Sequence, residues 1–461
     1  MPVLVEAPKS TREEVSAMLR LAWPLVLANL AGIAITTTDV LMLGRLGARE
    51  LASSALAVNL YSLVMFSGTG LAVGAAPLIA AALGRRRHAI RDSRRTFRMG
   101  IWLVGVYCLA GWLLLWNSER LFLLLGQDPV LSEGAGRFAR VLMWALLPAL
   151  LVALFRTALT AFDRTLVALA VALGGVAVNA VLNWMLIFGY WGAPALGLTG
   201  SALASLITTL LMALAMGLVL HRSRTFRRMH LFGRWWRFDR QRFVELAKVG
   251  VPIGIVWAFE VSVFSCAVFL MGLIDTTSVA AHVIALQLAS VSFMVPLGLA
   301  QAVTVRIGIA YGAGDRAWVG LAGKVALAVA MAFMSVAASI IWLFPGELAG
   351  LFLSEGRPEN AAVLALAVKF LLIAAVFQLA DGAQVVGAAM LRGLQDTRVP
   401  MLYAAFGYWA VGLGSGVGLA FGAGWRGEGI WTGLALGLAV VSVLMLWRWS
   451  RREKLGLVEA R

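Results

Sequence analysis

The sequence predicts an all-α, polytopic membrane protein with twelve transmembrane helices in two pseudo-symmetric six-helix bundles. Three observations support this prediction: the composition, a series of long uncharged runs, and an internal repeat. Of the 461 residues, 61% are hydrophobic and 13% are charged, whereas a soluble domain has about 45–50% apolar and about 25% charged residues. Together with a mean hydropathy of +0.87, these values indicate a chain whose solvent is lipid rather than water.

Long runs without a charged side chain supply the helices. A helix rises 1.5 Å per residue and needs roughly 20 residues to cross about 30 Å of hydrocarbon. Most of the runs meet this length, and the run 166–220 is long enough for two helices. A membrane β-barrel would instead show short alternating segments. Because only helices and closed barrels satisfy their backbone hydrogen bonds in lipid, an all-helical bundle follows.

We predict membrane spans at 20–43, 51–83, 99–117, 137–160, 166–190, 198–220, 249–274, 279–311, 317–344, 360–391, 399–422 and 429–448. The formal net charge of +16 comes from basic residues in the loops between spans, mainly within 85–98, 222–242 and 451–454. The positive-inside rule places these segments in the cytoplasm. The sequence therefore predicts a multi-pass protein of the inner (cytoplasmic) membrane with both termini cytoplasmic, whose partner is the lipid bilayer and not nucleic acid.

An internal repeat divides the chain. A shift of 228 residues lays Pro24 on Pro252, Gly70 on Gly298, and Gly84 on Gly312 without a gap. We expect an N-terminal six-helix lobe at 1–220, a basic cytoplasmic connector at 221–248, and a C-terminal six-helix lobe at 249–461. Parallel repeats of this kind are typical of secondary transporters, which rock two halves around one site. Since the sequence has no phosphate-binding loop of the ATPase type, we do not expect an ATP-driven pump. We do not expect an enzyme either.

Three acidic residues lie deep in predicted spans: Asp39 in the first, Glu260 in the seventh and Asp381 in the tenth. A charge at the bilayer centre costs about 2.5–3.5 kcal/mol, so each carboxylate must be protonated, bound to a cation or paired with a base. Protons and cations compete for a buried carboxylate. Such competition is what an antiporter needs to couple two fluxes.

The main alternative is a purely structural role for these acids. They could pair statically with basic residues that also lie in or near spans, namely Arg156, Arg306 and Lys369. A structure that shows such pairs would remove the reason to assign them a transport role.

Polar uncharged residues in the spans are further candidates for contacts with substrate or cation. Asn179 and Asn183 are four residues apart and share one helix face, although they could equally serve as hydrogen-bonding glue between helices. Gln384 and Gln287 are weaker candidates. His282 is more typical of an interfacial or hydrogen-bonded histidine than of a proton relay.

Four stretches together resemble the multidrug and toxic compound extrusion (MATE) family: Pro24 to Gly47, Asn179 to Gly189, Gly197 to Ala204, and Asp381 to Pro400. The resemblance implies two six-helix lobes around a V-shaped cleft. It also implies export of organic cations and drugs, driven by inward flow of sodium or protons. No cofactor is implied beyond this coupling ion, and we expect a monomer.

In the NorM-like branch of this family, a Glu of the seventh helix and an Asp of the tenth hold the coupling cation. These positions match Glu260 and Asp381, which would also be the metal ligands if the ion is sodium. The family's first-helix Asp matches Asp39. One position departs from the pattern, because a Tyr is common four residues before the tenth-helix Asp and this chain has Phe377. The missing hydroxyl weakens the case for sodium, since hard cations prefer oxygen ligands.

Two other functions fit parts of the pattern. A flippase for lipid-linked oligosaccharides would share the architecture, but it is expected to line its cleft with arginines that bind pyrophosphate. A membrane-embedded transferase would need clustered carboxylates or a histidine-containing loop at the membrane face. Arginine deep in the predicted spans is scarce and no Asp-rich motif appears, so an efflux transporter is the favoured prediction.

Overall fold

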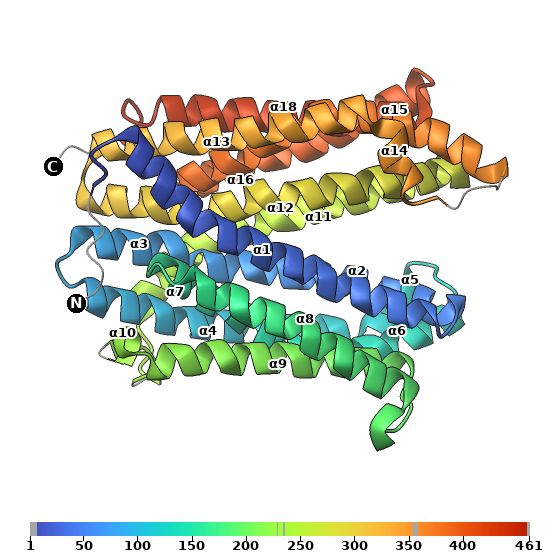
Figure 1. Ribbon diagram of the computed structural model, residues 1–461, viewed down its shortest axis with the longest axis horizontal. Helices are drawn as coiled ribbons and strands as arrows, with labels where there is room; N and C mark the ends of the chain where they lie inside the picture. The colour runs from blue at the N-terminus through green and yellow to red at the C-terminus, as the bar shows by residue number, and fades with distance from the viewer. Residues whose placement is uncertain (1–6, 228, 234–235, 354–357, 459–461) are drawn as a thin grey trace. The chain divides into compact units, whose positions relative to one another are not determined.

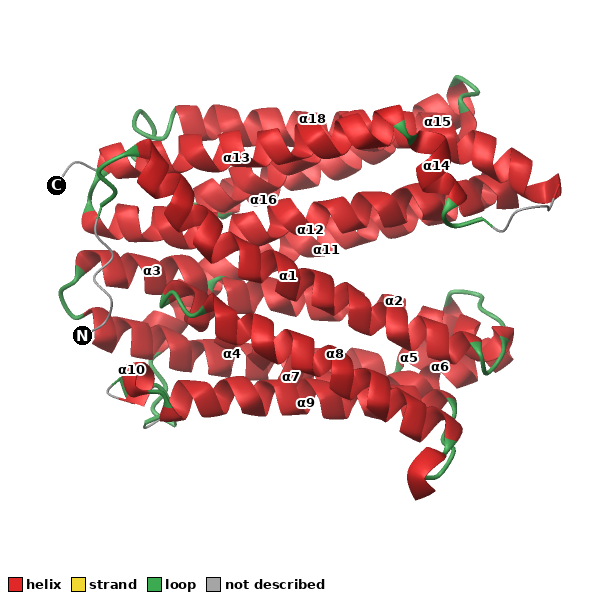
Figure 2. Cartoon of the chain, in the orientation of Figure 1, coloured by secondary structure: helices red, strands yellow, loops and turns green. Residues whose placement is uncertain are grey.

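The computed structural model describes residues 7–227, 229–233, 236–353 and 358–458. Within these ranges helices joined by loops make up the structure, and there is no strand (Figure 2). The helices before the connector are α1 (Thr11–Gly44), α2 (Ala48–Val73), α3 (Ala75–Arg85), α4 (Ala89–Trp116), α5 (Ser118–Leu124), α6 (Pro129–Leu142), η1 (Met143–Ala145), α7 (Leu146–Ala161), α8 (Thr165–Phe188), η2 (Tyr190–Gly192) and α9 (Leu198–Arg222). The later ones are α10 (Arg224–Arg227), α11 (Arg240–Ile274), α12 (Thr276–Ala313), α13 (Arg316–Leu343), α14 (Pro345–Gly350), α15 (Pro358–Gly393), α16 (Arg398–Ala405), η3 (Phe406–Leu413), α17 (Gly414–Val417), η4 (Gly418–Gly422) and α18 (Arg426–Ser450).

Twelve helical segments of the described chain are long and apolar enough to cross a membrane, which confirms the predicted fold class. Several segments extend beyond the predicted spans. The fourth, for example, covers Pro129–Ala161 instead of 137–160. Hydropathy detects the part of a helix that suits lipid, whereas the hydrogen-bonded helix continues through polar turns.

The predicted connector at 221–248 is partly helical. Helix α9 ends at Arg222, the short α10 follows, and α11 begins at Arg240, well before the predicted seventh span. The charged residues of this first part of α11 are unsuited to lipid but compatible with a helix. Among the described residues, helices therefore cover more of this segment than its composition indicates.

The described residues form two compact units. One unit is Leu27–Gly254, and the other combines the segment that ends at Val26 with the chain from Ile255 onward. Helices α1 and α11 thus each contribute to both units. Each passes from one unit to the other two residues after a proline, Pro24 in α1 and Pro252 in α11. Proline removes a backbone hydrogen bond and weakens the helix at that point.

Within each unit the long helices pack side by side. In the first unit α2, α4, α7 and α9 are neighbours, and in the second unit α15 packs against α12, α13 and α18 (Figure 1). Close backbone approach at glycines explains why parts of α1 and α11 join these groups. The backbone of α2 at Gly70 touches that of α11 at Gly254 in the first unit, and α12 at Gly298 touches α1 at Val26 in the second. A shift of 228 residues converts one contact into the other, so the internal repeat extends to the packing.

A buried ion pair fixes the start of α1 in the second unit. Glu14 is fully buried and accepts hydrogen bonds from Arg306 Nε, at 3.0 Å, and from Trp318 Nε1, at 3.1 Å. The Arg306 guanidinium also lies over the Trp318 ring, 5.2 Å from its centroid. Buried charges need this combination of pairing and hydrogen bonding.

Different contacts fix the start of α11 in the first unit. Arg95 Nε on α4 donates to Asp239 Oδ2 at 2.6 Å, directly before α11 begins. In the connector, the Phe232 ring packs edge-on against Phe97 and Phe155, with centroids 5.4 and 5.9 Å away. The connector is therefore held to α4 and α7 by both charge and apolar contact.

Candidate functional site

Asp39 is the centre of a polar cluster in the first unit. Its Oδ1 accepts a 2.5 Å hydrogen bond from Asn183 Nδ2, and its Oδ2 accepts one of 3.1 Å from Ser205 Oγ. The donors come from α8 and α9, far from α1 in sequence. Neutral donors stabilise a carboxylate without neutralising its charge. The partners of Asp39 are therefore amide and hydroxyl groups, and the charge remains available to a proton or a cation.

The asparagine pair on α8 extends this cluster. Asn183 Nδ2 also donates to Asn179 Oδ1 at 3.1 Å, and both residues are fully buried. Asn179 Nδ2 and Asn183 Oδ1 have no hydrogen-bond partner in the described chain. Because buried polar atoms are nearly always paired, these two atoms mark places where a water, ion or substrate group fits. The structure joins Asp39 with both predicted asparagines.

Glu260 and Asp381 come together in the second unit. Glu260 lies on α11 and Asp381 on α15, where Asp381 is only 5% exposed. The two carboxylates are close enough to interact electrostatically, and Glu260 also interacts with Arg392. Among the described residues, no side chain donates a hydrogen bond or forms an ion pair within 4.0 Å of either carboxylate. Two acids therefore share one buried region with a single base in electrostatic range.

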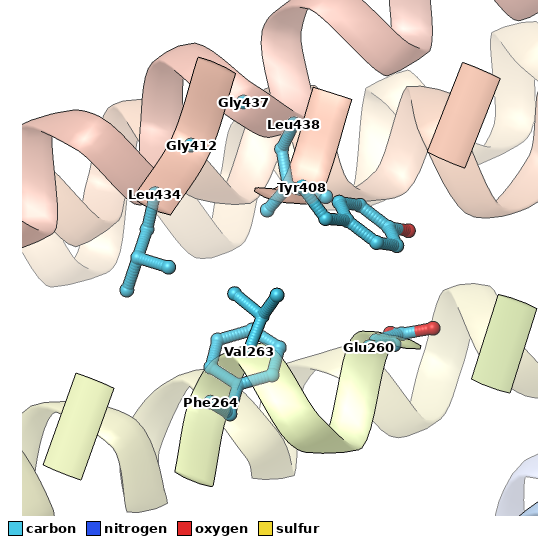
Figure 3. Close-up of a pocket in the computed structure, with 8 residues that line it drawn as sticks. All are labelled: Glu260, Val263, Phe264, Tyr408, Gly412, Leu434, Gly437 and Leu438. Carbon is cyan, nitrogen blue, oxygen red and sulfur yellow. The ribbon is translucent and has the colours of Figure 1, made fainter. Parts of the chain in front are cut away.

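A small cavity adjoins Glu260. Its walls are α11, η3 and α18, and it is lined by Glu260, Val263, Phe264, Tyr408, Gly412, Leu434, Gly437 and Leu438. Figure 3 shows Glu260 and Tyr408 on facing walls, with the carboxylate and the hydroxyl directed toward the same end. The cavity has room for about one water-sized group. The remaining lining is apolar, so a charge placed there interacts mainly with these two polar side chains.

The bases that could have neutralised the acids are engaged elsewhere. Arg156 Nη1 donates to Asn29 Oδ1 at 3.1 Å, and Lys369 Nζ pairs with Glu428 Oε1 at 2.9 Å. Arg306 pairs with Glu14. Static pairing of the three span acids with these bases is therefore wrong.

The weaker candidates differ in their surroundings. Gln384 is buried on α15 near Asp381, and its Oε1 has no partner in the described chain. Gln287 on α12 is exposed, and no described contact joins it to the acids. His282 is fully buried with both ring nitrogens unpartnered, and its ring packs on Trp431, 5.4 Å between centroids. His282 is thus a core residue, and the prediction of an interfacial or hydrogen-bonded histidine is wrong for the described chain.

The sequence did not single out Ser205, Tyr408 or Arg392. A serine or tyrosine in an apolar span is common, so neither gave a signal by itself. Arg392 could have been found, because it follows Asp381 by eleven residues, which is about three helical turns and returns to the same helix face.

The described residues contain no group of three His, Cys, Asp or Glu side chains that could hold a metal ion. The pair Glu260 and Asp381 instead suits a small hard cation or a proton, both of which bind carboxylate oxygen. Fold and sites together define a helical, multi-pass membrane protein with an acidic site inside each of its two units.

The sequence profile of the MatE family matches residues 24–185 and again 252–417. The chain belongs to this family. The two matches begin 228 residues apart, which is the shift of the internal repeat. The family that the sequence resembles is therefore the family to which it belongs.

Relatives of nearly the same length support this assignment. A probable multidrug resistance protein NorM from Mesorhizobium japonicum is 50% identical over 96% of this chain and 95% of its own length. Its counterpart from Brucella suis is 46% identical over 98% of this chain and 95% of its own.

Solved structures show the same fold at lower identity. The eukaryotic MATE transporter AtDTX14 has a TM-score of 0.85 and 21% identity, and covers 97% of this chain and 100% of its own. A mutant of the Vibrio cholerae MATE transporter VcmN has a TM-score of 0.87 and 18% identity, and covers 98% of this chain and 100% of its own.

Proposed function

We propose that this protein is a secondary active transporter that exports organic cations and drugs by antiport with sodium or protons through alternating access. The proposal rests on the surroundings of the three acidic residues in the membrane spans, Asp39, Glu260 and Asp381. Among the described residues, Glu260 and Asp381 share a buried region without an ion-pair partner, and Asp39 accepts hydrogen bonds only from neutral donors. The names of the relatives, multidrug resistance proteins, support drugs as the exported substrates.

The physical reason for coupling is the energetic penalty of a buried charge. Desolvation favours the protonated form of a carboxylate, and a bound cation favours the ionised form. A carboxylate can therefore exchange its ion when an organic cation competes for the same negative charge. Ion release on one side and ion binding on the other would link the two fluxes.

The proposed setting is the inner membrane, with both termini in the cytoplasm and the chain acting as a monomer. The orientation is supported by the distribution of arginine. The segment 85–98, the connector and the C-terminal tail carry most of the basic residues, as expected for cytoplasmic loops.

The test is efflux of ethidium, a fluorescent organic cation, from proteoliposomes under separately imposed sodium and proton gradients. Glu260→Gln, Asp381→Asn and Asp39→Asn each remove one charge with little change in shape. We expect each variant to lose gradient-driven efflux by roughly 5–150-fold, the usual range of a coupling free energy between two sites.

Glu428→Gln is the matched control, because this acid belongs to an exposed ion pair with Lys369. It should transport like the unaltered protein. Unchanged efflux in all three span variants would overturn the proposal, and so would wild-type efflux that responds to neither gradient.

A further inference from the structure

A second cavity, lined by arginines, lies in the first unit where the connector meets α4. It has a volume of about 380 Å³, and its lining includes Arg95, Arg98, Arg237, Asp239 and Arg240. This volume falls within the range of about 300–1,000 Å³ that is usual for small-molecule sites. Four arginines against one aspartate leave three positive charges in excess. The cavity therefore suits an anion.

Hydrogen bonds hold the connector against α4 and give the cavity its two walls (Figure 1). Arg95 Nε donates to Asp239 Oδ2 at 2.6 Å, and the backbone N–H of Asp239 donates to Met99 Sδ at 3.3 Å. Arg98 Nε donates to Leu231 O at 3.3 Å. The aspartate of the cavity is thus engaged with Arg95, on the α4 wall.

Arg237 and Arg240 supply positive charge on the connector wall. Both side chains are exposed, and within the described chain neither forms an ion pair or a side-chain hydrogen bond. Positive charges gathered around one cavity repel one another until an anion enters. Guanidinium groups bind phosphate oxygens through pairs of parallel hydrogen bonds. The residue type therefore favours a phosphate group as the anion.

The position of the cavity favours a lipid phosphate over a soluble one. Met99 lines the cavity and also begins the third predicted span, directly after Arg98. The cavity therefore lies at the end of the apolar part of α4, at the level of the phospholipid headgroups. On the connector, the side chains of Trp236 and Phe238 are 64% and 52% exposed, and the Phe238 ring packs edge-on against Trp102 of α4, with centroids 5.8 Å apart. Exposed aromatic rings beside arginines are typical of a membrane interface.

We propose that this cavity binds the headgroup phosphate of an anionic phospholipid. Arg98, Arg237 and Arg240 hold the phosphate oxygens, while Trp236 and Phe238 contact the first part of the acyl chains. The bound lipid thereby links the connector to the start of α4. In the proposed orientation the lipid comes from the cytoplasmic leaflet. The site lies in the first unit and does not depend on the identity of the coupling ion.

The test is binding of dioleoyl-phosphatidylglycerol to the purified, delipidated full-length protein in detergent, measured by native mass spectrometry over a range of lipid concentrations. Dioleoyl-phosphatidylcholine, whose headgroup has no net charge, is the comparison lipid and should bind more weakly. The double variant Arg237→Gln/Arg240→Gln removes both charges of the connector wall. We expect its dissociation constant for the most tightly bound phosphatidylglycerol to rise roughly 10–30-fold, as for loss of two arginines beside an anionic headgroup.

Arg87→Gln/Arg91→Gln is the matched control. It removes the same charge from two exposed arginines that lie outside the cavity, shortly before Arg95 in the sequence. Its affinity for phosphatidylglycerol should not change. A loss as large as that of the connector variant would show a general attraction by positive charge and would overturn the assignment of a site.

Hydrogen exchange provides a readout at the connector itself. In phosphatidylcholine nanodiscs, addition of phosphatidylglycerol should slow exchange in peptides covering residues 236–245 of the unaltered protein and of the control. Arg237→Gln/Arg240→Gln should abolish this slowing. Exchange that is the same with and without phosphatidylglycerol in the unaltered protein would show that no lipid links the connector to α4.

An arm with inorganic phosphate separates the two sources of the anion. Millimolar sodium phosphate should not displace phosphatidylglycerol, because it lacks the acyl chains that contact the aromatic residues. Displacement would show that the cavity binds a soluble anion and that the lipid assignment is wrong. Unchanged affinity for phosphatidylglycerol in Arg237→Gln/Arg240→Gln, or equal affinity for the two lipids in the unaltered protein, would also overturn the inference.

Discussion

The buried ion pair at the start of α1 provides a sharp test of how the second unit is held together. Glu14→Ala removes the carboxylate that accepts from both Arg306 and Trp318. Arg306 is 5% exposed, so the variant leaves a buried guanidinium without its counter-charge. The rest of the chain offers no acid in contact with it among the described residues.

The expected magnitude follows from burial. Loss of one partner of a buried ion pair costs about 3–5 kcal/mol, because the other charge stays desolvated and unpaired. The exposed pair of Lys369 and Glu428 in the same unit, with side chains 62% and 39% exposed, should contribute about 0–1 kcal/mol. Glu14→Ala and Glu428→Ala thus delete the same kind of group in opposite environments.

Hydrogen exchange read by mass spectrometry measures this difference locally. A loss of about 3–5 kcal/mol corresponds to roughly a hundredfold to several thousandfold faster exchange in the first turns of α1, if that segment opens on its own. Glu428→Ala should change exchange at the start of α18 by less than about tenfold. Equal small effects for both variants would show that burial does not determine the free-energy cost of losing the carboxylate.

Two further perturbations test other parts of the fold. Gly433→Val places a side chain against the backbone of Gly416 and should destabilise the protein by about 1–3 kcal/mol through overpacking. Thermal unfolding in detergent measures this loss. Gly418→Ala is the control, because a Cβ at Gly418 meets no atom within 4 Å. Equal unfolding temperatures for the two variants would contradict the expectation. The hydrogen bond from Arg95 lowers the pKa of Asp239 below its ordinary value of about 3.9. The contact therefore stabilises the connector fully above about pH 4. This stabilisation is lost as the pH falls through the lowered pKa of the folded state. Hydrogen exchange of the connector, corrected for intrinsic rates, should therefore accelerate in acid, and Asp239→Asn should remove that acid-dependent step; an unaltered pH profile in the variant would speak against the assignment.

Much of the fold could be predicted because membrane insertion depends on local composition. Each long apolar run must be a helix, and an acidic residue inside a predicted span is conspicuous because its transfer into lipid costs free energy. Asp39, Glu260 and Asp381 were found in this way, without knowledge of what surrounds them. The repeat was visible because prolines and glycines recur at a fixed shift.

Contacts between residues that are far apart in the sequence could not be predicted from composition. Ser205 is bound to Asp39 across 166 residues, and Tyr408 joins the wall opposite Glu260 across a similar distance. Hydropathy does not encode which face of a helix meets which neighbour. A tyrosine in a span is therefore indistinguishable from core packing until its surroundings are known.

The twelve helices, the repeat and the identity of the acids follow from the amino-acid sequence alone, because they depend on each residue's own transfer free energy into lipid and on the periodicity of the chain. Three features became visible only in the three-dimensional fold. Arg306 neutralises Glu14 instead of a membrane-embedded acid, parts of α1 and α11 each pack with the other half of the repeat, and Tyr408 of η3 lines the cavity of Glu260. These pairings depend on the close approach of helices that are distant in sequence, and glycine contacts and buried hydrogen bonds fix that approach.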